Sequence, residues 1–284
     1  MANVLLLRAA SQDAPDKYEA AFRAQGYHPV SIPVLETCPV NTSELRRIIS
    51  RGPVSERLSG VILTSARAVE VWKDVIEDLV RDGEDPGDAD WSRTPFYVVG
   101  EATATTLLDV SDAFPGSPYA PRNICGGAQS GTSEKLAHHI LHHHPLEGPR
   151  PTFLYLTGDK NRDTLPSILN AGGVDLKPLQ VYETRGSSTF AHDLRTTLEG
   201  LPLASNQWWI VHFAPSSANF VTPMIREHFT LPSIDSADQG AGNVRIAAIG
   251  PTTSTFLTDT LKLRVDAVAS KPSPEALLDA IQKA

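Results

Sequence analysis

The sequence repeats itself at a separation of about half its length. The matching segments are residues 63–69 with 213–219, 98–105 with 248–255 and, more loosely, 4–36 with 153–183. The separation is 151 positions in the first pair (Ser216 − Ser65) and 150 in the second (Gly250 − Gly100). A chain of 284 residues is long enough for two domains. Three matches at nearly one separation therefore predict a duplicated chain with two similar lobes.

Short β-branched or aliphatic runs alternate with helical patterns along most of the chain. This alternation is typical of parallel sheets with helices on both faces, so we expect an α/β fold. We expect strands at residues 3–8, 28–36, 60–63, 96–99, 152–156, 180–183, 208–213, 245–249 and 266–269. Residues 15–25 and 273–283 are predicted helices, the second with Ser273 as its N-cap. Residues 81–93 and 114–131 are rich in Gly, Pro, Asp or Ser, and we expect exposed loops there.

Two paths of the chain through the lobes agree with the repeat. The lobes could be contiguous, near residues 1–150 and 151–284. Alternatively, the chain could leave the first lobe at residues 32–36, build the second, and return at residues 180–182. The periodicity of the sequence does not choose between these paths.

The charge balance excludes some classes of partner. The chain has 25 Lys and Arg against 33 Asp and Glu, a formal net charge of −8. Proteins that bind duplex nucleic acid usually carry a basic excess, so we expect no nucleic-acid partner. No apolar run reaches the roughly 18 residues of a membrane-spanning helix, and we expect no membrane partner. The first residues lack a signal-peptide pattern, so we expect a cytoplasmic protein. Cys38 and Cys125 lack the spacing of a metal site or a dithiol, and in a cytoplasmic protein we expect both thiols to be reduced.

Several strong catalytic signatures are missing. The sequence contains no phosphate-binding loop of the form GxxxxGK[ST], no HExxH and no GxSxG. The glycines of residues 126–131 have the wrong spacing for dinucleotide binding. In the run from His138 to His144, histidines four apart could share a helix face and hold a metal. The favoured interpretation is a solvated helix end, so we expect no metal site at this run.

Hydroxyl residues and glycines gather where predicted strands end and helices begin. They are Thr64, Ser65, Gly100, Thr103, Gly158, Ser216, Ser217, Gly250, Thr252 and Thr253. Ligands of parallel sheets lie outside the carboxyl ends of the strands, and free N–H groups of a helix first turn bind phosphate or carboxylate. Any one of these residues is more simply explained as an N-cap. Taken together they predict a site that holds a polyanion through neutral donors.

Four further side chains are candidates for the same site. Arg8, Arg67 and Arg162 lie at or near the same strand ends and could add positive charge. Each of them could equally be an ordinary surface arginine. Tyr182 lies in the segment that would cross between lobes, where it could be a packing residue or a phenol facing the ligand.

An ordered set of motifs resembles the uroporphyrinogen-III synthase family of tetrapyrrole biosynthesis. The motifs are IPVL at residues 32–35, LTSARAV at 63–69, VVGEATA at 98–104, GDKNRDTLP at 158–166, VYET at 181–184, FAPS at 213–216, AAIGPTT at 247–253 and ASKPSP at 269–274. Their order along the whole chain carries the resemblance. One departure is Ala214, where the family commonly has Ser, so we expect this loop to bind mainly through its backbone.

The resemblance implies a fold and an activity. It implies a first lobe of residues 1–36 plus 185–284, a second lobe of residues 37–183, and linker strands near 32–36 and 180–184. It also implies a monomeric lyase without cofactor or metal that acts in haem biosynthesis. The substrate would be hydroxymethylbilane, a linear tetrapyrrole with several carboxylates. The enzyme would close the ring with inversion of the last pyrrole and loss of water.

This resemblance gives the candidate residues their expected roles. Tyr182 is the candidate general acid for loss of the hydroxyl group. Thr103, Thr252 and Thr253 are expected to position carboxylates of the substrate. The alternative function from another class is a non-catalytic two-lobed protein that binds a small polyanion. A sugar-phosphate enzyme is a third interpretation, which the lack of a poised His, Glu or Lys disfavours.

Overall fold

The apolar run near the start of the sequence forms strand β1 (Asn3–Leu7), in which every residue is buried. The computed structural model of the chain describes residues 2–11, 15–83, 85–143, 149–200, 207–234 and 243–284. Strand β1 lies inside a five-stranded sheet and pairs in parallel with one strand on each side. Its alternate residues pack into two different apolar clusters, one on each face. A strand covered on both faces requires such an unbroken apolar run.

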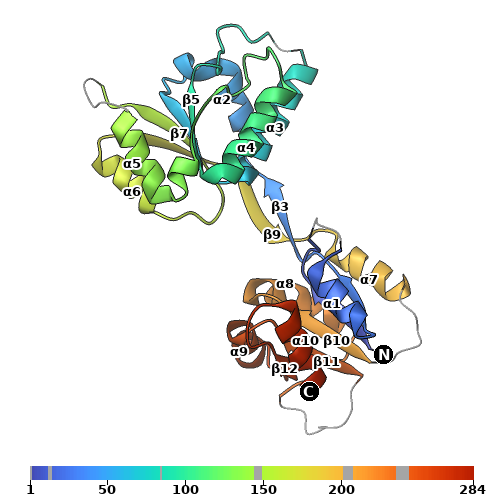
Figure 1. Ribbon diagram of the computed structural model, residues 1–284. Coiled ribbons are helices and arrows are strands. Elements are labelled where there is room, and N and C mark those ends of the chain that lie inside the picture. Colours follow the sequence, from blue (N-terminus) through green and yellow to red (C-terminus); the bar gives the residue numbers. More distant parts are fainter. Residues whose placement is uncertain (1, 12–14, 84, 144–148, 201–206, 235–242) are drawn as a thin grey trace. The chain divides into compact units, whose positions relative to one another are not determined.

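Contacts among the described residues divide the chain into two units. Unit 1 comprises Met1–Glu36 and Arg185–Ala284, and unit 2 comprises Thr37–Thr184. The chain therefore leaves unit 1 once and returns to it once, as the colours of Figure 1 show. Both passages run along β3 (Leu35–Pro39) and β9 (Tyr182–Gly186), which pair as a two-stranded sheet.

Unit 1 is a parallel sheet between two layers of helices. Its strands are β1, β2 (His28–Ser31), β10 (Trp208–His212), β11 (Val244–Ala248) and β12 (Ala267–Val268). Its helices are α1 (Lys17–Ala24), α7 (Phe190–Gly200), α8 (Pro215–Arg226), α9 (Pro251–Asp259) and α10 (Pro274–Lys283). Helices α1 and α10 contribute to the apolar cluster on one face of the sheet, and α7 and α8 to the cluster on the other.

Unit 2 has the same layers. Its strands are β4 (Gly60–Leu63), β5 (Pro95–Val99), β6 (Asn123–Gly127), β7 (Thr152–Thr157) and β8 (Asp175–Gln180). Its helices are α2 (Thr42–Ser55), α3 (Ala66–Arg81), α4 (Gly100–Ala113), the short 3-10 helix η1 (Ala128–Ser130), α5 (Ser133–His143) and α6 (Thr164–Ala171). One face packs against α2, α3 and α4, and the other against α5 and α6.

The two sheets have equivalent strand orders, which confirms the predicted α/β class with two similar parallel sheets. The orders are β12-β11-β10-β1-β2 and β6-β5-β4-β7-β8. The segment β1–α1–β2 thus corresponds to β7–α6–β8, and it comes first in unit 1 but last in unit 2. This difference in order explains the pattern of the sequence repeat. Residues 4–36 of unit 1 match a later segment of unit 2, whereas residues 63–69 and 98–105 of unit 2 match later segments of unit 1.

The prediction of exposed loops at residues 81–93 and 114–131 is wrong in part. The second stretch contains β6, which pairs with β5, and the glycines that suggested a loop are needed there. A Cβ at Gly126 would lie 2.5 Å from the Ser130 hydroxyl and 2.6 Å from the Val98 carbonyl oxygen. In the first stretch, Trp91 is fully buried and donates a hydrogen bond of 2.9 Å to the carbonyl of Ile49.

Several predicted element ends also move. The expected strand 28–36 is two strands, β2 and β3, separated at Pro33. The expected strand 180–183 falls on the junction between β8 and β9. Helix α1 begins at Lys17 rather than Pro15, because the Asp16 carboxylate accepts the first-turn N–H groups and forms the N-cap. The predicted N-cap of α10 is confirmed, since the Ala276 N–H donates to the Ser273 hydroxyl at 3.3 Å.

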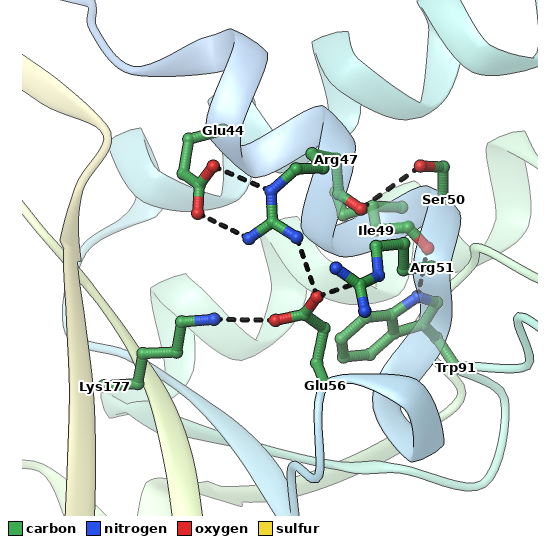
Figure 2. A network of polar contacts seen from close by, with 8 residues as sticks. All are labelled: Glu44, Arg47, Ile49, Ser50, Arg51, Glu56, Trp91 and Lys177. Carbon is green, nitrogen blue, oxygen red and sulfur yellow. Dashed lines mark hydrogen bonds and ion pairs between the residues drawn. The ribbon is translucent and has the colours of Figure 1, made fainter.

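A buried carboxylate fixes the end of α2 against the edge strand β8. The Glu56 side chain is 6% exposed and accepts hydrogen bonds from Arg47 at 2.9 Å and Lys177 at 2.7 Å. Figure 2 shows these contacts together with the ion pair to Arg51 at 3.3 Å. Burial alone would raise the pKa of Glu56, but the hydrogen bonds from Lys177 and Arg47 outweigh it and lower that pKa. The network therefore stabilises a charged group inside unit 2.

Candidate functional site

The predicted site residues of unit 2 follow three neighbouring parallel strands. Thr64 and Ser65 follow β4, Gly100 begins the helix after β5, and Gly158 follows β7. Strands β5, β4 and β7 are adjacent and parallel, so these residues share the carboxyl edge of one sheet. This is the edge where parallel sheets place their ligands.

The turn after β4 brings an arginine to the linker strand β9. Ser65 is the N-cap of α3, and its hydroxyl accepts the Arg67 N–H at 3.2 Å. The exposed Arg67 guanidinium lies 3.5 Å from the Thr184 hydroxyl, and its Cζ is 6.0 Å from the ring centroid of Tyr182. The structure thus brings together Arg67 and Tyr182, which are far apart in the sequence.

Tyr182 lies against the loop that follows β7. A Cβ at Gly158 would be 2.5 Å from two carbons of the Tyr182 ring and 2.7 Å from its hydroxyl oxygen. Glycine is therefore required there by close approach of the phenol. The same loop is joined to β9, because the Thr184 N–H donates to Asp159 at 3.3 Å. The Asn161 amide closes the loop on the Gly158 carbonyl at 2.7 Å.

The other candidates in unit 2 differ in exposure. Gly100 has a φ of +76°, a left-handed value that favours glycine, and no side chain caps the helix α4 that it begins. Thr103, in the first turn of α4, is 6% exposed. Arg162 is exposed and forms no ion pair with a residue that the structure describes. Arg162 and Arg67 are thus accessible at the carboxyl edge of unit 2, and Lys160 of the loop after β7 is exposed as well.

In unit 1 the structure commits Arg8 to an internal ion pair. Its guanidinium contacts both carboxylate oxygens of Asp16, at 3.0 and 2.9 Å. Its Cζ lies 4.8 Å from the ring centroid of Tyr18 and 5.6 Å from that of Phe213. Burial would raise the pKa of Asp16, but hydrogen bonds from Ser11, from Glu19 and from Arg8 lower it well below its ordinary value. The positive charge of Arg8 is therefore already paired with the Asp16 carboxylate.

The hydroxyl residues of unit 1 divide into buried and exposed pairs. Ser217 is 2% exposed and donates to the Ala214 carbonyl at 2.9 Å, so its hydroxyl is used inside α8. Thr253 is also buried, at 4%. Ser216 and Thr252, one residue earlier in each helix, are exposed. The structure brings only the exposed pair to the surface of the carboxyl edge.

Ordinary N-capping does not account for most of these residues. Ser65 caps α3, but α4, α8 and α9 have no side-chain hydrogen bond at their N-caps, which are Val99, Ala214 and Gly250. An uncapped helix start leaves N–H donors and a partial positive charge open to a bound anion. Both units therefore present uncapped helix N-termini at the carboxyl edge of their sheet.

Comparison with known proteins decides the family. The family model described as uroporphyrinogen-III synthase HemD matches residues 16–279. The chain belongs to the uroporphyrinogen-III synthase family. Among curated relatives, the uroporphyrinogen-III synthase of Saccharomyces cerevisiae is 28% identical over 288 residues, covering 98% of this chain and 95% of the relative. The enzyme of the same name from Schizosaccharomyces pombe is 27% identical, covering 99% and 96%.

Solved structures of the same family also match along the chain. The uroporphyrinogen-III synthetase of Helicobacter pylori is 19% identical with a TM-score of 0.45, covering 100% of this chain and 99% of the other. A mutant uroporphyrinogen III synthase of Thermus thermophilus is 17% identical with a TM-score of 0.41, covering 100% of both chains.

Sequence reasoning about this uroporphyrinogen-III synthase family member missed Tyr155 of β7. Its side chain is 5% exposed. Burial raises the pKa of Tyr155, the Thr64 side chain acts to lower it, and nearby Tyr182 and Asp163 raise it. Tyr155 stands inside an apolar strand run, where a tyrosine is usually a packing residue. No signal in the sequence distinguishes it.

Only part of the histidine run, His138–His143, lies among the described residues. Within the described ranges, no group of three or more His, Cys, Asp or Glu side chains could hold a metal ion. The rings of His139 and His143 are 4.1 Å apart, and the Nδ1 of His143 lies 2.8 Å from the carbonyl of His139. Burial, followed by the neighbouring His143 and His142, lowers the pKa of His139. His144 lies outside the described residues.

Among the helices of the described chain, none combines the length and apolar character that crossing a membrane requires.

Proposed function

We propose that the protein closes hydroxymethylbilane to uroporphyrinogen III, with inversion of the last pyrrole and loss of water, in tetrapyrrole and haem biosynthesis. The observation that carries this proposal is family membership across residues 16–279. The arrangement of both carboxyl edges supports it, since uncapped helix N-termini suit a substrate with acetate and propionate groups. The reaction breaks a C–O bond and forms a C–C bond without a net change of oxidation state. It is a lyase reaction that needs no redox cofactor.

At the carboxyl edge of each unit, the residues proposed to hold carboxylates are mainly neutral donors with few cations. The exposed Ser216 and Thr252 stand in the first turns of α8 and α9, and Arg67 and Arg162 add positive charge in unit 2. Thr64, Ser65, Gly100, Thr103, Gly158, Gly250 and Thr253 shape the same strand-to-helix turns. Arg8 and Ser217 act in this proposal by holding unit 1 turns in place, because their polar atoms are used internally.

Tyr182 is the proposed general acid. The hydroxyl of the terminal hydroxymethyl group takes the phenolic proton and leaves as water, and the electron-rich pyrrole stabilises the resulting azafulvene-type cation. The methylene carbon of this cation bonds to the ring carbon of the last pyrrole that already carries the bridge to the third pyrrole, giving a spiro intermediate. The bond from that ring carbon to the bridge carbon then breaks, and the bridge carbon bonds to the free carbon on the opposite side of the last pyrrole nitrogen. Loss of the ring proton to the phenolate restores Tyr182.

Modest acid catalysis suffices for this chemistry, because an electron-rich pyrrole expels a neighbouring hydroxyl group readily. The more demanding task is to make the substituted carbon react before the free one, which is a matter of orientation. The short contact between Gly158 and the Tyr182 ring supports this role, since it fixes the phenol at the edge where the helices begin. We further propose a cytoplasmic monomer, as the family resemblance implies.

The test is turnover of enzymatically generated hydroxymethylbilane, with chromatographic identification of the ring isomer. We expect the wild type to form the inverted isomer faster than spontaneous closure forms the other. Tyr182→Phe should slow turnover by about a hundredfold, the lower range for general acid catalysis, without lowering the melting temperature. Tyr27→Phe is the control, because Tyr27 is a partly buried tyrosine that precedes β2 in unit 1. An undiminished rate for Tyr182→Phe would remove Tyr182 from the mechanism.

The same assay separates the alternative function. A non-catalytic binding protein would retain the linear tetrapyrrole while only the non-inverted isomer accumulated at the spontaneous rate. That result would contradict the proposed synthase activity.

A further inference from the structure

Hydrogen bonds on both sides hold the glycine that contacts the phenol of Tyr182. Gly158 follows β7, and a Cβ on it would lie 2.5 Å from two carbons of the Tyr182 ring. The peptide group before this glycine is held because the Thr157 carbonyl accepts the Val181 N–H at 2.9 Å. The peptide group after it is held because the Asn161 side-chain amide donates to the Gly158 carbonyl at 2.7 Å. Both φ and ψ of the glycine are therefore restrained.

A glycine needs such restraint more than any other residue. It has no Cβ and samples left-handed and right-handed backbone conformations, so it has the most conformational freedom to lose when it is ordered. The close approach of the phenol leaves no room for a Cβ at position 158. The loop thus combines a position that requires glycine with a side chain, that of Asn161, which removes the freedom that glycine brings.

A second side chain of the same loop holds the strand that carries Tyr182. The Asp159 carboxylate accepts the Thr184 N–H at 3.3 Å. Thr184 and Tyr182 are two residues apart in β9, so their side chains lie on the same face of that strand. The backbone just after Tyr182 is therefore tied to the loop that packs against its ring.

We propose that Asn161 is a positioning residue for Tyr182, acting through the Gly158 carbonyl, and that Asp159 supports it through β9. This inference rests on the proposed function, in which the Tyr182 hydroxyl gives its proton to the leaving hydroxyl group. The donor oxygen must lie within hydrogen-bond reach of the oxygen that leaves, and a displacement of about 1 Å can cost on the order of a hundredfold in rate. A loop that holds one side of the ring limits that displacement.

A substrate-binding role for Asn161 would change the kinetics differently. Asn161 is exposed and precedes Arg162, a candidate for binding carboxylates. Loss of a contact with the substrate would raise KM and leave kcat nearly unchanged. Loss of positioning lowers kcat with little change in KM, because the groups that hold the substrate remain in place. The split between KM and kcat therefore separates the two roles.

The experiment compares Asn161→Ala with Asn123→Ala in steady-state turnover of hydroxymethylbilane. Asn123 is also an exposed asparagine of unit 2, and its amide donates to the Arg93 carbonyl at 3.2 Å. It begins β6 and so lies at the amino edge of the sheet, opposite the candidate site. We expect Asn161→Ala to lower kcat about fivefold to tenfold, the fold-change of one lost hydrogen bond, with KM nearly unchanged. Asn123→Ala should retain wild-type kcat and KM.

A double-mutant cycle tests whether Asn161 acts through Tyr182. In the Tyr182→Phe background, Asn161→Ala should lower kcat no further, because the proton donor that Asn161 positions is already absent. A general loss of structure would instead lower kcat by the same factor in both backgrounds. Equal factors in both backgrounds, a raised KM with wild-type kcat, or wild-type kinetics for Asn161→Ala would overturn the proposal.

Asp159 provides a second pair of variants. Asp159→Ala removes the acceptor for the Thr184 N–H, whereas Asp159→Asn keeps an acceptor oxygen in its side-chain amide. We expect Asp159→Ala to lower kcat about threefold and Asp159→Asn to retain most of the wild-type kcat. If Asn161→Ala does not fold, this pair decides, and a wild-type kcat in Asp159→Ala overturns the proposal.

Wild-type turnover separates this inference from the proposed function. If the wild type does not form the inverted isomer, the proposed function fails and the role of Asn161 fails with it. If the wild type forms that isomer and Asn161→Ala has wild-type kinetics, only the positioning role is wrong.

Discussion

His212 should make the folded chain sensitive to mild acid. It is the last residue of β10, is 0% exposed, and neither of its ring nitrogens has a hydrogen-bond partner. In register it lies between Leu7 of β1 and Ala248 of β11. Burial lowers the pKa of His212 from 6.5 to about 4, and no neighbouring charge contributes. The ring is therefore neutral and confined inside unit 1.

The sign of the pH dependence follows from proton binding in the two states. In the unfolded chain His212 takes up a proton as the pH falls through 6.5, whereas in the folded chain it does so only near 4. Between these pH values the unfolded state binds more protons than the folded state. The contribution of His212 to the stability of the folded chain is therefore complete above pH 6.5 and decreases as the pH falls toward 4. A difference of about 2.5 between the two pKa values corresponds to about 3 kcal/mol in the free energy of unfolding.

The assay is urea denaturation of the wild type and of His212→Leu at about pH 7.5 and about pH 4.5. Other groups titrate in both proteins, so the relevant quantity is the stability difference between them. We expect that difference to change by about 2.5 kcal/mol over this range, in favour of the variant at the lower pH. Leucine also removes two unpaired nitrogens, so the variant should be no less stable at pH 7.5.

His192→Leu is the matched control, because His192 belongs to α7 of the same unit and is exposed to solvent. Its stability difference from the wild type should stay constant between the two pH values. A constant difference for His212→Leu would refute the reasoning, since it would mean that the ring is solvated or paired in the folded chain.

Three further outcomes follow from contacts and charge. Gly158→Ala should lower turnover with little change in melting temperature, because a Cβ there would displace the Tyr182 ring, and wild-type kinetics would contradict the assigned contact. Glu56→Gln should lower the free energy of unfolding by about 1–3 kcal/mol, since it removes the charge of a buried carboxylate that accepts hydrogen bonds from Arg47 and Lys177. Glu44→Gln is the control, because Glu44 also pairs with Arg47 but its side chain is 43% exposed. In urea denaturation this variant should lower the free energy of unfolding clearly less than Glu56→Gln does. Moderate salt should not raise KM for the substrate, because it screens the repulsion between an anionic substrate and the net charge of −8. A steep rise in KM with salt would indicate a far more basic site.

Much of the architecture could be predicted because its causes are local. Apolar runs such as that of β1 are buried on both faces, and Ser273 caps α10 through an N–H three residues away. The repeat predicted two similar sheets. The errors arose where composition and tertiary context conflict: Gly126 lies in a strand because no side chain fits beside Ser130, and Trp91 is buried within a segment of turn residues.

The candidate site was predictable only as a set of strand ends. The motifs indicated which turns would meet at a carboxyl edge, because parallel strands bring such turns together whatever their side chains are. They did not indicate that Arg8 is neutralised by Asp16 or that the Ser217 hydroxyl is used inside its helix. Those outcomes depend on side-chain geometry within single turns, which residue type alone does not specify.

The sequence by itself determined the class of fold, the duplication and the family, because these depend on patterns repeated over many residues. Only the tertiary structure decided which side chains meet. The Tyr182 ring lies against Gly158, and the Arg67 guanidinium lies 3.5 Å from the Thr184 hydroxyl, across separations that no local pattern encodes. The physical reason is that hydrogen bonds and close contacts act over a few ångströms in space, and folding brings to that distance residues that lie far apart along the chain.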